Sequence, residues 1–168
     1  MPAVLTVLAG LAMAIAAVAI VFVLGMRTKS PIVLRPLIWF SRRFMNPAQM
    51  RTAGRPGAYA GIIRVPGRRT GRLIETPVGI VAVDDTFLIA TPYGAGAQWV
   101  RNALAAGEAE LVWEGHIYRV DRPEVVQTRD VARHFSPTDQ RLFRLMRTDH
   151  CLRLRRLAVV EAEAPLAA

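Results

Sequence analysis

The sequence contains one cysteine, Cys151, and three histidines, and this scarcity excludes several kinds of site. A single cysteine forms no intramolecular disulfide, which fits a reducing compartment. His116, His134 and His150 lack the spacing of metal ligands, so we predict no metal site. Paired carboxylates and a Ser/His/Asp set, which would indicate acid–base or nucleophilic catalysis, are also missing.

Charged side chains are absent from the first 26 residues. The apolar run from Ala3 to Met26 is longer than the ~20 residues that cross a bilayer, so we predict a transmembrane helix. A cleaved signal peptide would need a basic start, an apolar core of ~7–15 residues and a small-residue cleavage site, and none of these is present. Basic residues follow the helix, and before it only the amino terminus is basic, which predicts a single-pass protein of the cell membrane whose C-terminal domain is cytoplasmic. These basic residues are Arg27, Lys29, Arg35, Arg42, Arg43, Arg51 and Arg55.

The formal net charge of +9 raises the question of nucleic-acid binding. Seven of the 22 basic residues lie between positions 27 and 55, where attraction to anionic lipid of ~1 kcal/mol each explains them. A nucleic-acid face would interleave aromatic residues with arginines. Only Trp39, Phe40 and Phe44 lie near an arginine cluster, and that cluster is beside the predicted membrane span. We therefore predict no nucleic-acid partner.

Composition divides the chain into three predicted parts. Residues 1–26 are the transmembrane anchor, residues 27–56 are a basic amphipathic juxtamembrane segment and linker, and residues 57–168 are a cofactor-binding domain. Apolar and arginine residues alternate over 31–50 as in an interfacial helix, although packing of this segment on the domain is an equal alternative. The Gly/Pro-rich stretch RTAGRPG at 51–57 is typical of a connector.

Alternating apolar residues and turn signals make strands the dominant element of the C-terminal domain. Strands are predicted over 59–65, 73–83, 86–91, 110–113, 116–122 and 152–160, and helices over 98–106 and 138–147. Pro77 implies an edge or a bulge in its strand, and Ser136 is a predicted helix N-cap. This order indicates an antiparallel α+β barrel and not a doubly wound parallel sheet.

An arginine-rich turn, PGRRTGR, follows the first predicted strand. Arg68, Arg69 and Arg72 stand beside backbone N–H groups that Gly67 and Gly71 leave accessible. Such a turn suits a phosphate or a string of carboxylates, because guanidinium groups bind these oxyanions through paired hydrogen bonds. A solvated surface turn is the alternative, and this feature alone does not decide between them.

A second stretch, TPYGAGAQWVRN at 91–102, is a glycine-containing loop that leads into a helix. The helix N-terminus offers unpaired donors to an anion, and the glycines allow a flat ring to approach the backbone. By themselves, Trp99 is typical of a core residue and Asn102 of a surface residue.

Taken together, GRRTGR, the following TP, a strand pair and YGxxxxWVRN resemble the deazaflavin-dependent nitroreductase family over residues 57–126. The resemblance implies an α+β fold, a six-stranded-type antiparallel split β-barrel of the FMN-binding kind with peripheral helices, here preceded by one transmembrane helix. It also implies the coenzyme F420.

The resemblance further implies which positions bind this coenzyme. The phosphate and oligoglutamate tail would lie on the hairpin formed by Gly67, Arg68, Arg69, Thr70, Gly71 and Arg72. The deazaflavin ring would meet Thr76, Pro77 and Val78, and also the loop residues Thr91, Pro92, Tyr93 and Gly94. Trp99 and Asn102 would close the pocket from the helix.

The sequence departs from the family pattern at three places. Ile74 stands where members often have a basic residue, so tail binding would rest on Arg72. Tyr93 stands where some members have lysine. Where several members line the substrate pocket with tyrosines from the C-terminal helix, this helix has Phe143, Leu145 and Met146.

The resemblance implies an F420H2-dependent oxidoreductase that transfers a hydride from C5 of the reduced deazaflavin. With a membrane anchor, the predicted acceptor is a menaquinone-like quinone, with nitroaromatic compounds as a side activity, and Tyr93 is the candidate catalytic residue. Three alternatives stay open: FMN in place of F420, a membrane-anchored binding or scaffold protein without turnover, and a homodimer or a membrane-protein partner.

Overall fold

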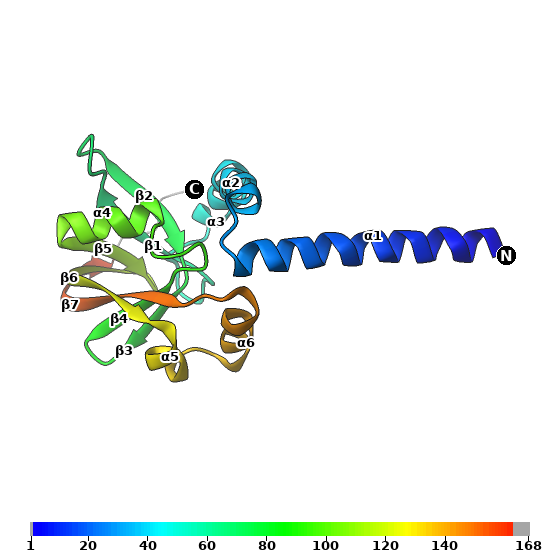
Figure 1. Ribbon diagram of the computed structural model, residues 1–168. Coiled ribbons are helices and arrows are strands. Elements are labelled where there is room, and N and C mark those ends of the chain that lie inside the picture. The colour runs from blue at the N-terminus through cyan, green and yellow to red at the C-terminus, as the bar shows by residue number, and fades with distance from the viewer. Residues whose placement is uncertain (1, 163–168) are drawn as a thin grey trace.

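The computed structural model describes residues 2–162, within which helices precede an antiparallel β-sheet (Figure 1). The N-terminal helices are α1 (Pro2–Arg27), α2 (Pro31–Phe40), the π-helix η1 (Ser41–Met45) and α3 (Asn46–Met50). The strands are β1 (Gly61–Pro66), β2 (Leu73–Val78), β3 (Ile80–Val83), β4 (Thr86–Ala90), β5 (Glu108–Trp113), β6 (His116–Gln127) and β7 (His150–Ala162). Between strands lie α4 (Gln98–Ala106), α5 (Thr128–Val131), the 3-10 helix η2 (Ala132–His134) and α6 (Pro137–Met146).

The seven strands pair in the order β2-β1-β5-β6-β7-β4-β3, and every pairing is antiparallel. The two edge strands, β2 and β3, are consecutive in the chain and are separated only by Gly79. The chain therefore passes at Gly79 from one edge of the sheet to the other and curls the sheet into a split β-barrel. The prediction of a split barrel is confirmed, and the single strand predicted over 73–83 is in fact two strands.

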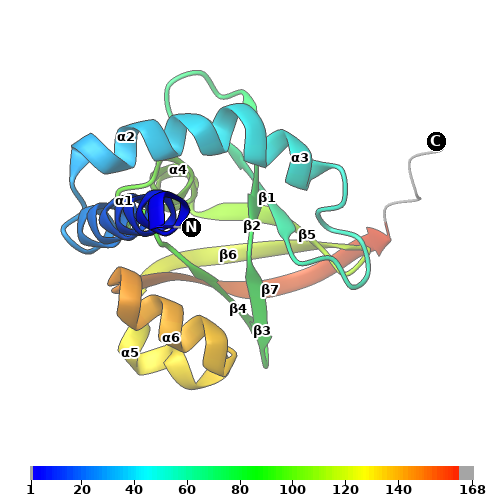
Figure 2. The same ribbon diagram turned by 90° about the vertical axis from the view of Figure 1, so that its right-hand side faces the viewer.

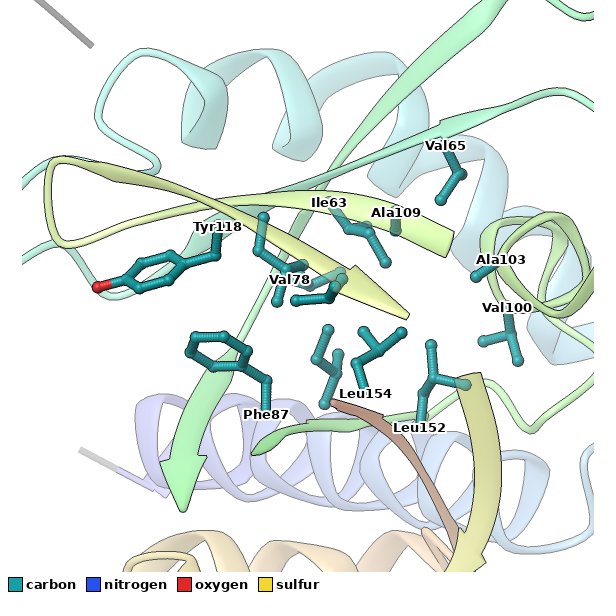
Figure 3. Packing of buried hydrophobic residues seen from close by; sticks show 13 residues of the cluster. Ile63, Val65, Val78, Phe87, Val100, Ala103, Ala109, Tyr118, Leu152 and Leu154 are labelled. Carbon is teal, nitrogen blue, oxygen red and sulfur yellow. The ribbon is translucent and has the colours of Figure 1, made fainter. Parts of the chain in front are cut away.

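Side chains that alternate along the strands fill the barrel (Figure 3). Ile63 and Val65 from β1, Phe87 from β4 and Leu154 from β7 are fully buried. Helix α4 contributes Val100 and Ala103 to the same buried cluster, which also contains Val78 of β2. The strand alternation that the sequence shows therefore defines the core.

Helix α1 extends away from the barrel as a single rod (Figure 1). Its stretch Val4–Arg27 is long and apolar enough to span a membrane, and the most apolar part of this stretch has no buried residue. α2, η1 and α3 form one continuous helical segment that crosses the base of α1 (Figure 2). The corner between α1 and α2 is tight, because a Cβ at Gly25 would lie 2.3 Å from Cγ2 of Val33.

The last helix, α6, begins as the sequence predicts. The Ser136 hydroxyl accepts a hydrogen bond from the Asp139 backbone N–H at 3.1 Å, and Pro137 follows at the first helical position. Helices α5 and η2, just before it, have no counterpart in the sequence prediction. Their four and three residues are too short to produce a recognisable apolar period.

Candidate active site

The arginine-rich turn forms a compact hairpin between β1 and β2. Gly67 donates its N–H to the Arg72 carbonyl at 2.8 Å, and Gly71, whose φ is +66°, donates to the Gly67 carbonyl at 2.8 Å. Arg68, Arg69 and Arg72 are exposed, and within residues 2–162 none of them forms an ion pair. The hairpin thus presents three guanidinium groups that are free to bind an anion.

Strand β2 leads from this hairpin toward the mouth of the barrel. Thr76 and Pro77 are half-buried and pair with Ile63 and Ile62 of β1, and Val78 is buried in the barrel core. Pro77 lies on an edge strand, as predicted, where its missing N–H leaves no partner strand unsatisfied.

The loop between β4 and α4, residues 91–97, is called the ring loop below. Thr91 is buried, and both its N–H and its hydroxyl donate to the His150 carbonyl, at 3.1 and 2.7 Å. Gly94 has a φ of +91° and donates to the Thr91 carbonyl at 2.8 Å. Because the Thr91 hydroxyl already donates its proton, its role in this structure is to fasten the loop to the start of β7.

Helix α4 begins at the end of the ring loop without a side-chain cap. Its N-cap residue, Ala97, makes no side-chain hydrogen bond, and the first turn carries no acidic residue. The backbone N–H groups of this turn therefore remain available to an anionic or carbonyl ligand.

Two side chains of α4, Trp99 and Asn102, differ in their burial and in their contacts. Trp99 is half-buried and packs against the barrel core. Asn102 is only 2% exposed, and its Nδ2 lacks a hydrogen-bond partner in the described part of the chain. A buried amide donor without a partner is costly, and a ligand that accepts its hydrogen bond would remove that cost. The sequence alone suggested an exposed Asn102.

These observations show which predicted positions come together. Val78 from β2 and Val100 from α4 belong to one buried cluster, and Trp99 packs against it. The end of β2 (76–78), the ring loop that leads into α4 and the start of α4 are together called the barrel mouth below, and the arginine hairpin lies at the opposite end of β2 (Figure 1). Uncapped donors, the Asn102 amide and three unpaired arginines fit a ligand with a polar ring and an anionic tail.

Tyr93, the candidate catalytic residue, lies in the ring loop and is half-buried. Among the described residues its hydroxyl has no hydrogen-bond partner. The hydroxyl is thus available to a ligand.

Helix α6 offers few side chains to the ring loop. Phe143 packs edge-on against Phe135, with ring centroids 5.0 Å apart, in a separate apolar cluster. Leu145 is exposed, and Met146 contributes its carbonyl oxygen, which accepts a hydrogen bond from Lys29.

Sequence reasoning missed two contacts that join the N-terminal segment to the site. Lys29 Nζ donates to the Pro92 carbonyl of the ring loop at 2.9 Å. Arg42 Nη2 donates to Gln98 Oε1, at the start of α4, at 2.7 Å. Both residues belong to the basic segment 27–56, for which the sequence left attachment to the membrane and packing on the domain as alternatives, and no local pattern indicates which residues reach the barrel.

A cavity of about 510 Å³ lies elsewhere, between α5–η2 and the outer side of β3, β4, β6 and β7. Its lining includes Leu88, Val126, Asp130 and His134, together with the ion-paired Glu124 and Arg153. None of the predicted coenzyme-binding residues lines it.

The curled antiparallel sheet with its peripheral helices defines a split β-barrel protein. The model of the F420H2-dependent quinone reductase family matches residues 35–150, more than half of the sequence, and the chain belongs to this family. It is therefore an F420-dependent oxidoreductase, as the sequence motifs imply.

Several solved structures have similar chain traces. An FMN-binding protein from Syntrophomonas wolfei subsp. wolfei has 13% identity and a TM-score of 0.49, with 79% of this chain and 98% of that chain covered. An F420 reductase has 12% identity and a TM-score of 0.44, with 65% and 93% covered. A candidate 5-nitroimidazole antibiotic resistance protein from Bacteroides thetaiotaomicron has 12% identity and a TM-score of 0.45, with 70% and 81% covered. A search of curated proteins found no relative of this sequence.

Proposed function

We propose that this protein transfers a hydride from F420H2 to a menaquinone-like quinone at the cytoplasmic face of the membrane. In this proposal residues 1–26 are the anchor, residues 27–56 the membrane-proximal segment and residues 57–168 the catalytic domain; residue 1 and residues 163–168 of these ranges lie outside the described part of the chain. Reduced F420 supplies the hydride from C5, and the quinone takes up this hydride and a proton to become the quinol. The protein supplies binding, orientation and exclusion of water.

The arginine hairpin holds the anionic tail of the coenzyme in this proposal. Arg68, Arg69 and Arg72 are exposed and unpaired in the described part of the chain, so a phosphate or a carboxylate displaces no existing ion pair. Gly67 and Thr70 shape the turn that brings them together, since the Thr70 N–H donates to the Gly67 carbonyl at 3.2 Å.

The barrel mouth orients the ring. Thr76, Pro77 and Val78 face it from β2, and Pro92, Tyr93 and Gly94 face it from the ring loop, with Trp99 as an apolar wall. The Asn102 amide gains an acceptor when a ring carbonyl binds, which suits a donor that is buried and unpaired. Tyr93 donates a hydrogen bond from its hydroxyl to the acceptor carbonyl and so stabilises the negative charge that forms there during hydride transfer.

The observation that carries the membrane part of the proposal is the rod-like α1, whose apolar surface is exposed along its length. The helical segment across its base, α2–α3, exposes aromatic side chains typical of the interface, with Trp39 63% exposed and Phe40 and Phe44 about half exposed. Arg35, Arg42 and Arg43 border a groove beside Trp39 and suit anionic headgroups. All these groups lie on the C-terminal side of α1, and this asymmetry supports a cytoplasmic barrel in the proposal.

Coenzyme binding is tested by fluorescence titration of the detergent-solubilised full chain with F420, FMN and NADPH. We expect saturable binding of F420, weakened by about tenfold or more in the double variant Arg68→Gln/Arg69→Gln, since each hydrogen bond to a charged group contributes ~1.5–3 kcal/mol. Arg129→Gln is the matched control, because Arg129 is an exposed arginine on α5 with its side chain 83% accessible.

Equal affinity of the double variant and the control would overturn the role of the hairpin. Tighter binding of FMN than of F420 would show that FMN, and not F420, is the coenzyme. Tight F420 binding without quinone reduction would show that the protein binds or carries the coenzyme without turnover, and would refute the catalytic proposal.

A further inference from the structure

The N-terminal helices are attached to the ring loop through one residue, Lys29. It is the only lysine of the chain, whose other 21 basic residues are arginines. It occupies the turn between α1 and α2 with a φ of +53°. Its Nζ donates to two carbonyl oxygens that are distant in sequence, Pro92 at 2.9 Å and Met146 at 3.2 Å.

An ammonium group suits this position better than a guanidinium group. Three N–H bonds diverge from one nitrogen and can reach carbonyls that belong to different segments, whereas the donors of arginine lie in one plane. Partial burial lowers the pKa of Lys29, and the opposing influence of Asp149 is smaller. The side chain lies half-buried between the ring loop and the end of α6.

The corner that carries Lys29 is rigid. The packing of Gly25 against Val33 leaves no room for a side chain at position 25. The Ser30 N–H donates to the Gly25 carbonyl at 3.0 Å, and the Thr28 hydroxyl donates to the Leu24 carbonyl at 2.9 Å. The position of the Lys29 backbone therefore follows the position of α1.

A neighbouring cation holds α6 but not the ring loop. Arg27 Nη1 donates to the carbonyls of Arg144 and Leu145 at 3.3 and 3.2 Å, in the last turn of α6. Lys29 is the residue of this corner that also reaches the ring loop. Arg27 thus offers a control that removes a cation and an α6 contact from the same corner while leaving the loop contact intact.

We propose that Lys29 is a positioning residue that holds the ring loop in its coenzyme-binding conformation and so couples the site to the N-terminal helix. The inference rests on the proposed function, because the ring loop is the segment assigned to the deazaflavin ring. Thr91 fixes the start of the loop to β7 and α4 fixes its end, so the Lys29 contact at Pro92 restrains the stretch between them. Without this contact the loop samples other conformations, and the coenzyme must restrict it again on binding.

The first test compares Lys29→Met and Arg27→Met in the full chain. We expect Lys29→Met to raise the Kd of F420 by about tenfold, equivalent to ~1.4 kcal/mol, and to speed hydrogen exchange in residues 92–97. Arg27→Met should keep the Kd of F420 within about twofold, because Arg27 contacts α6 and not the ring loop, and a substitution away from a site changes its affinity little. Equal F420 affinity in Lys29→Met and wild type would overturn the inference.

A second test needs no variant. Because Lys29 is the only lysine, reductive methylation of the native chain modifies this side chain and the α-amino group, which peptide mass spectrometry distinguishes. Coupling is reciprocal, so a contact that favours coenzyme binding must itself be favoured by the coenzyme. We expect saturating F420 to slow methylation of Lys29 but not of the α-amino group, and an unchanged Lys29 rate would contradict the inference. Failure of the wild type to bind F420 at all would instead refute the proposed function.

Discussion

At the scale of single residues, Asn102 connects stability to coenzyme binding. Its buried Nδ2 is unpaired within residues 2–162, and such a group costs ~1–3 kcal/mol. We expect Asn102→Leu to raise the free energy of unfolding of the coenzyme-free protein by about 1 kcal/mol and to weaken F420 binding. Denaturant unfolding and F420 titration of the same preparations check both effects, and wild-type affinity in the variant would exclude Asn102 from the site.

Cys151 is a structural residue in this account, and its thiol provides a probe of unfolding. The side chain is fully buried, and its thiol lies 3.5 Å from the Thr128 hydroxyl. Burial raises the pKa of the thiol above its ordinary value, and the hydrogen bond between Thr128 and the thiol opposes this only in part. The neutral thiol is therefore the native form.

Two outcomes follow for Cys151. A thiol reagent should modify it only at the rate of unfolding. The pKa of the thiol is higher in the folded chain than in the unfolded chain. The contribution of the neutral thiol to the free energy of unfolding is therefore complete below the unfolded pKa of ~8.5 and is lost as the pH rises from that value toward the folded pKa. Urea unfolding at neutral pH and at about pH 10 measures this effect. Between these two pH values the free energy of unfolding should fall more in the wild type than in Cys151→Ala. Rapid modification of the native protein would contradict the buried position.

At the scale of elements, two glycines lie where the barrel closes, and only one of these positions excludes a larger side chain. A Cβ at Gly61 would lie 2.4 Å from Ile80 Cδ1 and 2.7 Å from the Val112 carbonyl oxygen, where β1 meets β3 and β5. A Cβ at Gly79, the bend between β2 and β3, would have no neighbour within 4 Å.

The two glycine substitutions should therefore differ. We expect Gly61→Ala to lower the free energy of unfolding by about 1–3 kcal/mol, because the Val112 backbone cannot move aside. Gly79→Ala, the matched control, should change it by less than about 1 kcal/mol. Chemical denaturation of both variants checks the difference, and equal stabilities would show that the barrel does not close tightly at Gly61.

Elements with a strong local signal are the ones that the sequence predicts well. Helix α4 has the predicted bounds of 98–106, since an apolar face and a terminal glycine define it locally, and Gly107 takes the left-handed conformation. The break at Gly79 is not visible in the sequence, because β-branched residues continue on both sides of it. The burial of Asn102 and the contacts of Lys29 were also missed, since they depend on segments that meet only in the folded chain.

At the scale of the whole molecule, the direction of α1 determines which face of the barrel would meet the membrane in the proposed arrangement. Viewed along α1, the helical segment α2–α3 lies on one side of its base and α6 on the other (Figure 2). Both expose apolar side chains, among them Trp39 and Leu145. The ring loop is bonded to the same corner through Lys29. The site is thus attached next to the surface from which a lipid-soluble acceptor would arrive.

The most direct test of F420H2-dependent quinone reduction at the membrane uses proteoliposomes that contain the full chain. Menaquinone is placed either in the same bilayer as the protein or in separate liposomes, and the gain of F420 fluorescence reports oxidation of F420H2. The account predicts rapid oxidation only when protein and menaquinone share a bilayer. Equal rates in the two arrangements, or no oxidation in either while F420 still binds, would contradict it.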